Sequence, residues 1–307
     1  MRHILQHGEH IRDVQDSMRC KDTTVSKEKG AEVTCTICSS VARVYYRHPD
    51  ALIYECDKCS HVFTDPSAAH FHEIYTDKYF SDEHKNWFRY PDMRLWQRIV
   101  SQIPNCATSL LDVGCGKGAF LKFVQTQRPG LSLTGIDIAC PVNAIEGITL
   151  IKDDFMSSQL PGTYDVVVSL ATIEHVQDIN GYLRRVRNVL RENGQFTVVT
   201  VNNRSALYRI ARVVSKIGIQ IATNRLYSLH HLHHFTHDSL RSVLQNNNFL
   251  ITSHVSHNAP LRAMDIPAGN RLIRLALWAA VAIAFGFGRL IGACYQQTVV
   301  CSKVPDF

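Results

Sequence analysis

Short apolar runs and amphipathic segments alternate along the chain from about residue 109 to residue 201. The apolar runs are rich in Val, Ile and Leu, as are strands that are buried on both faces of a sheet. Helical segments between such strands act as crossovers, and crossovers join parallel strands. The alternation therefore predicts an α/β domain with a mostly parallel sheet. The predicted strands are SLLDVG (109–114), LSLTGID (131–137), ITLIK (148–152), YDVVVSL (164–170), QFTVVTV (195–201), FLITSHV (249–255) and YQQTVVCSK (295–303).

Apolar residues recur at helical spacing in four further segments, at 93–103, Gly118–Thr126, Asn180–Asn193 and His237–Asn246. Two stretches, 205–232 and 259–293, do not fit the alternation of strand and helix. We expect both stretches to be helical insertions in the α/β domain.

The first 30 residues are polar and lack a sustained apolar period, which predicts a mobile tail. They contain no apolar core of a secretory signal, so we expect a cytoplasmic protein with reduced cysteines. The formal net charge of +6 over 307 residues would suit a phosphorylated substrate or an acidic membrane surface. The basic residues are too few and too dispersed to indicate a nucleic acid, and no pattern indicates an oligomeric state.

Two Cys-x-x-Cys pairs, Cys35 with Cys38 and Cys56 with Cys59, are separated by seventeen residues. This spacing is typical of tetrahedral zinc sites. Four sulfur ligands leave no open position on the metal, so the predicted zinc is structural. A module of this length, residues 31–66, needs such a metal because it cannot build a hydrophobic core of its own. Disulfides are the alternative.

The loop between the cysteine pairs interleaves aromatic and basic residues, namely Arg43, Tyr45, Tyr46 and Arg47. Such a pattern can stack nucleic-acid bases. Aromatic residues in a hairpin more often pack against protein, and packing is the interpretation that we favour.

The sequence LLDVGCGKGAF, Leu110 to Phe120, places a glycine-rich turn between a buried strand and a helix. Gly114, Gly116 and Gly118 have no Cβ, so they permit a tight turn and allow a ligand to lie against the backbone. Glycines in this arrangement could also bind NAD. Asp112 within the motif, and the segments that follow, favour a different cofactor.

Acidic residues follow the next two strands. Asp137, at the end of the second strand, can accept hydrogen bonds from both hydroxyls of a ribose. Asp154 and Phe155 follow the third strand, and an acid beside an apolar ring suits the amine and the flat face of an adenine. The fourth strand leads into Ser169 and Leu170. All these segments lie at carboxyl ends of strands, where open α/β sheets bind ligands.

The segments DVGCGKG, GIDI, DDF and YDVVVSLATIEHV resemble the successive motifs of class I S-adenosylmethionine-dependent methyltransferases, over roughly residues 75–303. The resemblance implies a Rossmann-like seven-stranded sheet whose last strand is antiparallel, with S-adenosylmethionine as the cofactor. Within the turn, Cys115 is interpreted as a small packing residue, not a nucleophile. The implied contacts are Asp112, Gly114, Cys115, Gly116 and Gly118 along the methionine part, Asp137 and Ile138 at the ribose, Asp154 and Phe155 at the adenine, and Ser169 and Leu170 below the sulfonium.

The segment YECDKCSHVFTDP resembles the zinc-binding front end of some bacterial methyltransferases, including those that act on deoxysugars. The next segment, IYTDKYF, is similar to their linker. We therefore expect a helical linker or lid at 67–104 and the methyltransferase domain at 105–303. His61 lies close to the second cysteine pair and is predicted to be a bystander.

The histidine-rich segment HHLHHFTHDSL (230–240) is similar to the segment that lies near the acceptor in ubiquinone and sugar methyltransferases. An oxygen acceptor benefits from a base that titrates near pH 7, which is a histidine's range. His175 is the first candidate, followed by His231 and His234. The predicted function is methyl transfer to a small-molecule, sugar or lipid-linked acceptor, at oxygen. The alternatives are an RNA methyltransferase that uses the zinc ribbon, and a non-catalytic scaffold that binds the cofactor.

Residues 206–222 have the spacing of an amphipathic basic helix. LALWAAVAIAFGFG, residues 275–288, is apolar but short for a membrane span of about 20 residues. We predict that both are lid helices packed on the sheet. The alternative is a peripheral surface that touches a membrane or a lipid-linked substrate.

Overall fold

The computed structural model describes residues 32–65, 85–140, 145–266 and 270–304. The predicted tail at 1–30 lies outside the described residues, and so does the first part of the predicted linker, up to residue 84.

A seven-stranded sheet forms the centre of the unit that extends from Thr34 to the C-terminus. Its strand order is β10-β11-β8-β7-β4-β5-β6. β11 runs antiparallel to the other six strands, which all run in the same direction. All seven predicted strands are present, and the predicted Rossmann-like fold with an antiparallel last strand is confirmed. The strands are β4 (Ser109–Val113), β5 (Ser132–Ile136), β6 (Ile148–Ile151), β7 (Tyr164–Leu170), β8 (Leu190–Val201), β10 (Phe249–His257) and β11 (Gln296–Lys303).

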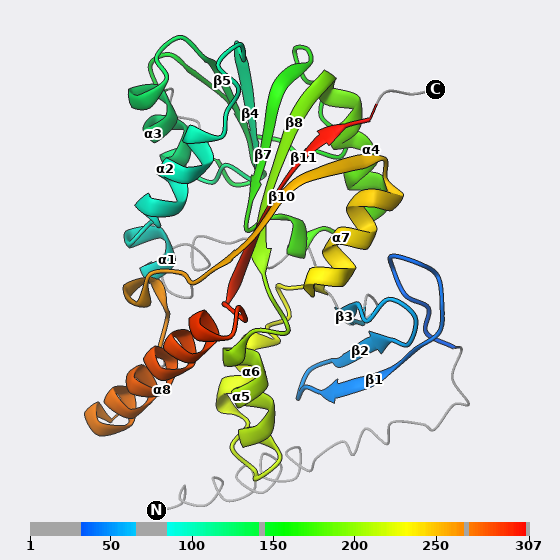
Figure 1. Cartoon of the computed structure of the whole chain (residues 1–307), viewed down its shortest axis with the longest axis vertical. Coiled ribbons are helices and arrows are strands. Elements are labelled where there is room, and N and C mark those ends of the chain that lie inside the picture. The colour runs from blue at the N-terminus through cyan, green and yellow to red at the C-terminus, as the bar shows by residue number, and fades with distance from the viewer. Residues whose placement is uncertain (1–31, 66–84, 141–144, 267–269, 305–307) are drawn as a thin grey trace, which may run out of the picture. The chain divides into compact units, whose positions relative to one another are not determined.

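Helices cover both faces of this sheet (Figure 1). α2 (Met93–Ser101) and α3 (Ala119–Gln127) lie on one side, and α4 (Ile179–Val189) and α7 (His237–Asn246) lie on the other. Apolar residues on these helices pack against strands of Val, Leu and Ile, so the core requires both layers. The short helix α1 (Lys85–Arg89) precedes α2.

Two predicted helices differ from the structure. The helix expected over Asn180–Asn193 ends at Val189, because β8 already begins at Leu190. The basic helix expected over 206–222 is divided into α5 (Ala206–Ser215) and α6 (Ile221–Leu226). Gly218 lies between them with φ +91°, a conformation that favours glycine and that an α-helix does not contain.

A second, four-stranded sheet contains the cysteine-rich segment. β1 (Ala42–Arg47), β2 (Leu52–Cys56) and β3 (Val62–Thr64) are antiparallel, and β3 also pairs with β9 (His233–His234). The histidine-rich segment that follows α6 therefore supplies the last strand of the cysteine-rich sheet.

The apolar insertion forms the helix α8 (Arg271–Leu290), which follows the short 3₁₀ helix η5 (Leu261–Ala263). It is longer than the apolar run predicted at 275–288, and most of its surface is exposed, so the expectation of a helix packed on the sheet is wrong. Figure 1 shows α8 projecting from one end of the sheet, beside α5. Asn270 caps its first turn by accepting a hydrogen bond from the backbone of Leu272.

Candidate functional site

The glycine-rich turn lies at the carboxyl end of β4, as predicted. Gly114, Gly116 and Gly118 all have positive φ angles, of 77°, 52° and 73°. A Cβ built on Gly114 would lie 2.1 Å from Oγ1 of Thr172, so no larger residue fits this turn without displacing that side chain. Cys115 is buried beneath the turn, and its Sγ would lie 2.7 Å from a Cβ on Gly135. This position fits a packing residue, because burial raises the pKa of the thiol.

Asp137 links the second strand to the turn. One carboxylate oxygen accepts a hydrogen bond of 2.9 Å from the backbone N–H of Gly116, and the other accepts one of 2.7 Å from Ala139. The next residue, Ile138, is 48% exposed. Asp137 and Ile138 thus lie together at the carboxyl edge of the sheet, where the ribose contact was predicted.

Asp112 is the buried acid of the site. Only 2% of its surface is exposed, and its Oδ1 has no hydrogen-bond partner among the described residues. Burial, with a further contribution from Asp137, raises the pKa of Asp112 to about 8. A buried oxygen without a donor fits a site that receives a polar or cationic ligand group, as the ammonium group of S-adenosylmethionine would be.

The predicted adenine contacts differ from one another in accessibility. Asp154 is exposed and accepts a hydrogen bond from the backbone of Met156. Phe155 is buried, with the guanidinium of Arg185 over its ring at 5.3 Å and Tyr182 against its edge. The Phe155 ring is therefore covered by protein on the sides that these two residues contact.

The end of β7 carries the two residues predicted below the sulfonium. Ser169 is fully buried, and its Oγ accepts a hydrogen bond of 2.9 Å from the hydroxyl of Tyr182. Leu170 is partly exposed and packs against the core. The hydroxyl of Ser169 is thus engaged by the protein.

Glu174, His175 and His231 form a cluster just beyond β7. Their carboxylate and imidazole atoms lie within 4.8 Å of one another, a set that could also hold a metal ion. The rings of His175 and His231 meet edge to face at 4.9 Å. The structure therefore brings together two of the three predicted histidines, which are separated by 55 residues in the sequence.

Glu174 is a candidate that the sequence analysis did not select. Its side chain is 1% exposed and accepts a hydrogen bond from the hydroxyl of Thr200. Burial raises its pKa to about 7. The available signal was its position beside His175 at the carboxyl end of a strand. Sequence alone does not show that this carboxyl group is enclosed.

The ring of His175 is oriented by a hydrogen bond to the backbone of the histidine-rich segment. Its Nδ1 lies 2.5 Å from the carbonyl oxygen of His230. Because a carbonyl oxygen can only accept, Nδ1 carries the proton and donates a hydrogen bond to it. In this tautomer Nε2 has the lone pair that a general base uses.

His234 differs from the other two candidates. It is fully buried, its Nε2 lies 3.2 Å from Oγ1 of Thr64, and burial lowers its pKa to about 3. Such a group is enclosed in the protein interior, which argues against the direct role that we predicted for it. The neighbouring His233 is buried too and bonds to His61 at 3.0 Å between ring nitrogens. His61 therefore packs where the cysteine-rich segment meets β9 and is not part of the cysteine cluster.

The cysteine cluster has the geometry of a four-sulfur metal site. The Sγ atoms of Cys35 and Cys59 are 3.6 Å apart, those of Cys38 and Cys56 are 3.5 Å apart, and all four lie within 4.8 Å of one another. Four sulfurs at the zinc–sulfur distance of about 2.3 Å form a tetrahedron with edges of about 3.8 Å. All four thiols are free, so their arrangement fits zinc better than the disulfide alternative.

The aromatic residues between the cysteine pairs pack against the α/β domain. Tyr46 stacks on Tyr227 with ring centroids 5.4 Å apart, and its hydroxyl donates to the side chain of Asn224. Tyr45 meets the edge of the same Tyr227 ring. Arg43 is paired with Asp57. These contacts agree with the packing interpretation of the loop.

A family profile described as "Methyltransferase domain" matches residues 82–254, which is more than half of the chain. The chain belongs to this methyltransferase family. Its fold and cofactor motifs are those of class I S-adenosylmethionine-dependent methyltransferases, as the sequence analysis predicted.

Among curated relatives, the methyltransferase is 31% identical over 124 residues to the ubiquinone biosynthesis O-methyltransferase of Pseudomonas paraeruginosa (strain DSM 24068 / PA7). This match covers 37% of the chain and 53% of the relative. The corresponding enzyme of Aeromonas salmonicida (strain A449) is 31% identical over 110 residues, covering 32% of the chain and 45% of the relative. The chain thus spans about half the length of the curated relatives that it matches.

Two solved structures have a similar fold. The S-adenosylmethionine complex of phosphoethanolamine N-methyltransferase 2 from Haemonchus contortus matches with a TM-score of 0.52 and 13% identity, covering 77% of this chain and 60% of that one. A methyltransferase solved with the Trm112 activator of Haloferax volcanii matches with a TM-score of 0.50 and 15% identity, covering 75% and 94%. At these identities the likeness concerns the fold alone.

Proposed function

We propose that this methyltransferase transfers the methyl group of S-adenosylmethionine to an oxygen of a small-molecule, sugar or lipid-linked acceptor. The observation that carries the proposal is the set of groups at one edge of the sheet. The glycine turn, Asp112 and Asp137 would hold the cofactor, and the cluster of Glu174, His175 and His231 would face the acceptor. Bound S-adenosylmethionine supplies an activated methyl group, and the protein's task is to align the acceptor oxygen with it.

His175 is the proposed base. Its Nδ1 donates a hydrogen bond to the carbonyl of His230, which orients the ring, and Nε2 is the nitrogen that would take the acceptor proton. His231 and Glu174 lie against it and would stabilise the imidazolium that forms. His234 would act by holding the strand β9 in place.

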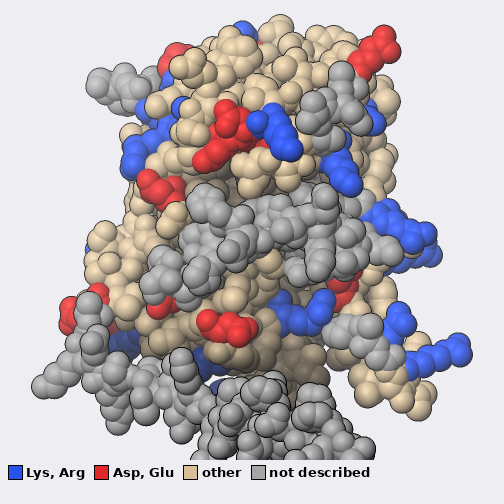
Figure 2. Space-filling view, turned by 180° about the vertical axis from the view of Figure 1, so that it is seen from behind, with Lys and Arg blue, Asp and Glu red and all other residues tan. Residues whose placement is uncertain are grey.

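We further propose that Cys35, Cys38, Cys56 and Cys59 bind one structural zinc ion, in a module that spans 31–66 and precedes a methyltransferase domain at 105–303. The protein would work in the cytoplasm. Among the described residues, Tyr45 and Tyr46 of the loop pack against Tyr227. This packing does not support the RNA alternative, in which these rings would stack on bases. Acidic and basic side chains are both scattered among uncharged residues on the described surface in Figure 2.

Replacing Asp137 by Ala should weaken binding of S-adenosylmethionine by about 1–3 kcal/mol, the range for a hydrogen bond to a charged group. Asp137 also holds the Gly116 turn, and its loss would loosen the backbone on which the cofactor lies. Calorimetric titration with S-adenosylmethionine measures the effect. Glu192→Ala, at an exposed acid on β8 outside the proposed cofactor contacts, is the control. Unchanged affinity in the Asp137 variant would refute the ribose assignment.

Binding of S-adenosylmethionine should release a proton from Asp112. The pKa of this acid is about 8 in the free protein, so the group is protonated at pH 6–7.5, and the cofactor's ammonium group would favour the ionised form. Affinity should therefore rise with pH across this window, by up to about tenfold per pH unit. Asp112→Asn should remove the dependence. Calorimetry in two buffers of different ionisation enthalpy counts the proton, and equal heats in both would exclude this linkage.

The acceptor can be sought by incubating the protein with methyl-labelled S-adenosylmethionine and a panel of phenols, quinols and sugar nucleotides. A labelled product identified by mass spectrometry supports the enzyme hypothesis. Cofactor binding without label transfer to the panel or to a cell extract would favour the scaffold alternative.

A further inference from the structure

The helix α8 presents an apolar stripe to solvent along its whole length. Leu272, Ile283 and Leu290 recur on this side and are 74%, 68% and 85% exposed. Leu275 and Phe287 extend the same stripe. An 18-residue window of the helix has a mean hydropathy of 1.6, so α8 is long and apolar enough to cross a membrane by length and composition alone. A continuous exposed apolar surface of this kind marks an interaction site.

The opposite side of α8 is attached to the protein. Ala284, Phe285 and Gly288 are buried, Phe285 stacks on Tyr295, and its carbonyl accepts a hydrogen bond from Asn258. The uncharged part between Arg274 and Arg289 is 14 residues long, or about 21 Å, which is shorter than a hydrocarbon core of about 30 Å. A helix attached in this way can lie on a bilayer but is poorly placed to cross one.

Positive charge borders the apolar stripe at both ends. Arg271 and Arg274 lie in the first turn of α8, and Arg289 lies in the last turn. Residues 206–226 and 270–293 contain no Asp or Glu. If two copies of the chain packed α8 against α8 antiparallel, these arginines would meet one another. The charge pattern therefore favours an anionic partner over a second copy.

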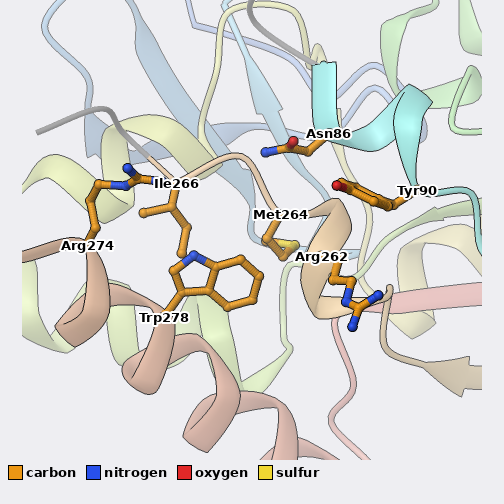
Figure 3. Close-up of a pocket in the computed structure, with 7 residues that line it drawn as sticks. All are labelled: Asn86, Tyr90, Arg262, Met264, Ile266, Arg274 and Trp278. Atoms are coloured by element: carbon orange, nitrogen blue, oxygen red, sulfur yellow. The ribbon is translucent and has the colours of Figure 1, made fainter. Parts of the chain in front are cut away.

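A cavity of about 340 Å³ lies beside the N-terminal half of α8, between this helix, η5 and α1 (Figure 3). Arg262 and Arg274 line it from different elements, together with Trp278 and Tyr90. The nearby acid Asp265 already accepts a hydrogen bond from the backbone of Asn86. Figure 3 shows the two arginines at opposite ends of the cavity, so each guanidinium group could contact a separate lipid phosphate.

A second apolar projection accompanies α8. Ile217, Ile219 and Ile221, in and after the turn between α5 and α6, are 76%, 53% and 61% exposed, and Lys216 adjoins them. α5 packs against α8, and Figure 1 shows the two helices at the same end of the sheet. Both projections thus lie at the same end of the sheet.

We propose that α8 and the turn between α5 and α6 dock the protein on an anionic phospholipid bilayer. The apolar stripe lies in the interface, and Arg262, Arg271 and Arg274 contact lipid phosphates. This docking needs no methyl transfer, so it can be tested apart from the proposed function.

The test is co-sedimentation of the full chain with vesicles of phosphatidylglycerol and phosphatidylcholine, or of phosphatidylcholine alone. Wild type should bind the anionic vesicles at low salt, and binding should weaken as salt rises. Ile283→Glu with Leu290→Glu should reduce partitioning at least about tenfold. Arg271→Gln with Arg274→Gln should reduce binding to anionic vesicles about fivefold per arginine. Leu250→Glu, at a 60% exposed site on β10, is the matched control and should bind as wild type does.

Calorimetric affinity for S-adenosylmethionine and thermal unfolding show whether each variant is folded. As a second measurement, in a background with Trp87, Trp96 and Trp278 replaced by Phe, tryptophan in Phe287→Trp should be quenched by brominated acyl chains, and tryptophan in Leu250→Trp should not. Protein that stays in the supernatant with both vesicle types overturns the proposal. Light scattering that shows a dimer, lost in Ile283→Glu, overturns it in favour of a second copy. Failure of methyl transfer would not affect either result.

Discussion

His175→Ala should lower the rate of methyl transfer by about 10²–10⁴-fold, the usual contribution of a positioned general base. The variant removes the imidazole whose Nδ1 donates to His230, but leaves the glycine turn and Asp137 in place. Affinity for S-adenosylmethionine should therefore stay within about twofold of wild type, because no bond to the cofactor is proposed for this ring. The measurement compares label transfer to the acceptor with calorimetric binding of the cofactor.

The pH profile separates a base from a structural histidine. The pKa of Glu174 is about 7, so this carboxyl group becomes charged as the pH rises through neutrality and can then stabilise an imidazolium on His175. The wild-type rate should rise across that range, and Glu174→Gln should remove or shift the rise. His254→Ala removes a partly exposed imidazole from β10 and should leave the rate unchanged. Full activity in the His175 variant would mean that the acceptor loses its proton without this base.

The strands of the large sheet could be predicted from the sequence because each one corresponds to a local run of residues. Runs such as LLDVG and YDVVVSL are mostly apolar and rich in Val and Leu, as are strands that are covered on both faces. The glycine turn and Asp137 are likewise adjacent to strand ends. They could be placed at one edge of the sheet without knowledge of long-range contacts.

The acceptor side depends on contacts that the sequence does not display. The pairing of Val62 with His234 joins residues 172 positions apart, and it encloses His234, which resembles His231 in the sequence. The exposure of α8 could not be predicted either, because a core helix and an interfacial helix share the same apolar composition. Burial depends on which elements fold over a segment, and composition does not encode that arrangement uniquely.

Removing the proposed zinc should slow methyl transfer while cofactor binding survives. The strand β3 follows the second cysteine pair directly and pairs with β9, so the cysteine-rich sheet holds the backbone next to His231. Thr64 at the end of β3 adds a further contact, because its hydroxyl donates a hydrogen bond to the carbonyl oxygen of His231. Structural zinc sites contribute about 10–16 kcal/mol to the stability of their modules. A module of 36 residues without its metal should therefore unfold and release that backbone.

The experiment uses the full chain. Elemental analysis should find one zinc per chain, and Cys56→Ser or prolonged chelation should remove it. Turnover should then fall at least about tenfold, the scale of a displaced catalytic group, with affinity for S-adenosylmethionine kept. Cys106→Ser replaces an exposed cysteine outside the cluster and should change neither metal content nor rate. A metal-free protein that keeps its fold and has four titratable thiols would rule out the site. A zinc-free variant with normal turnover would show instead that β9 holds the histidines without help from the module.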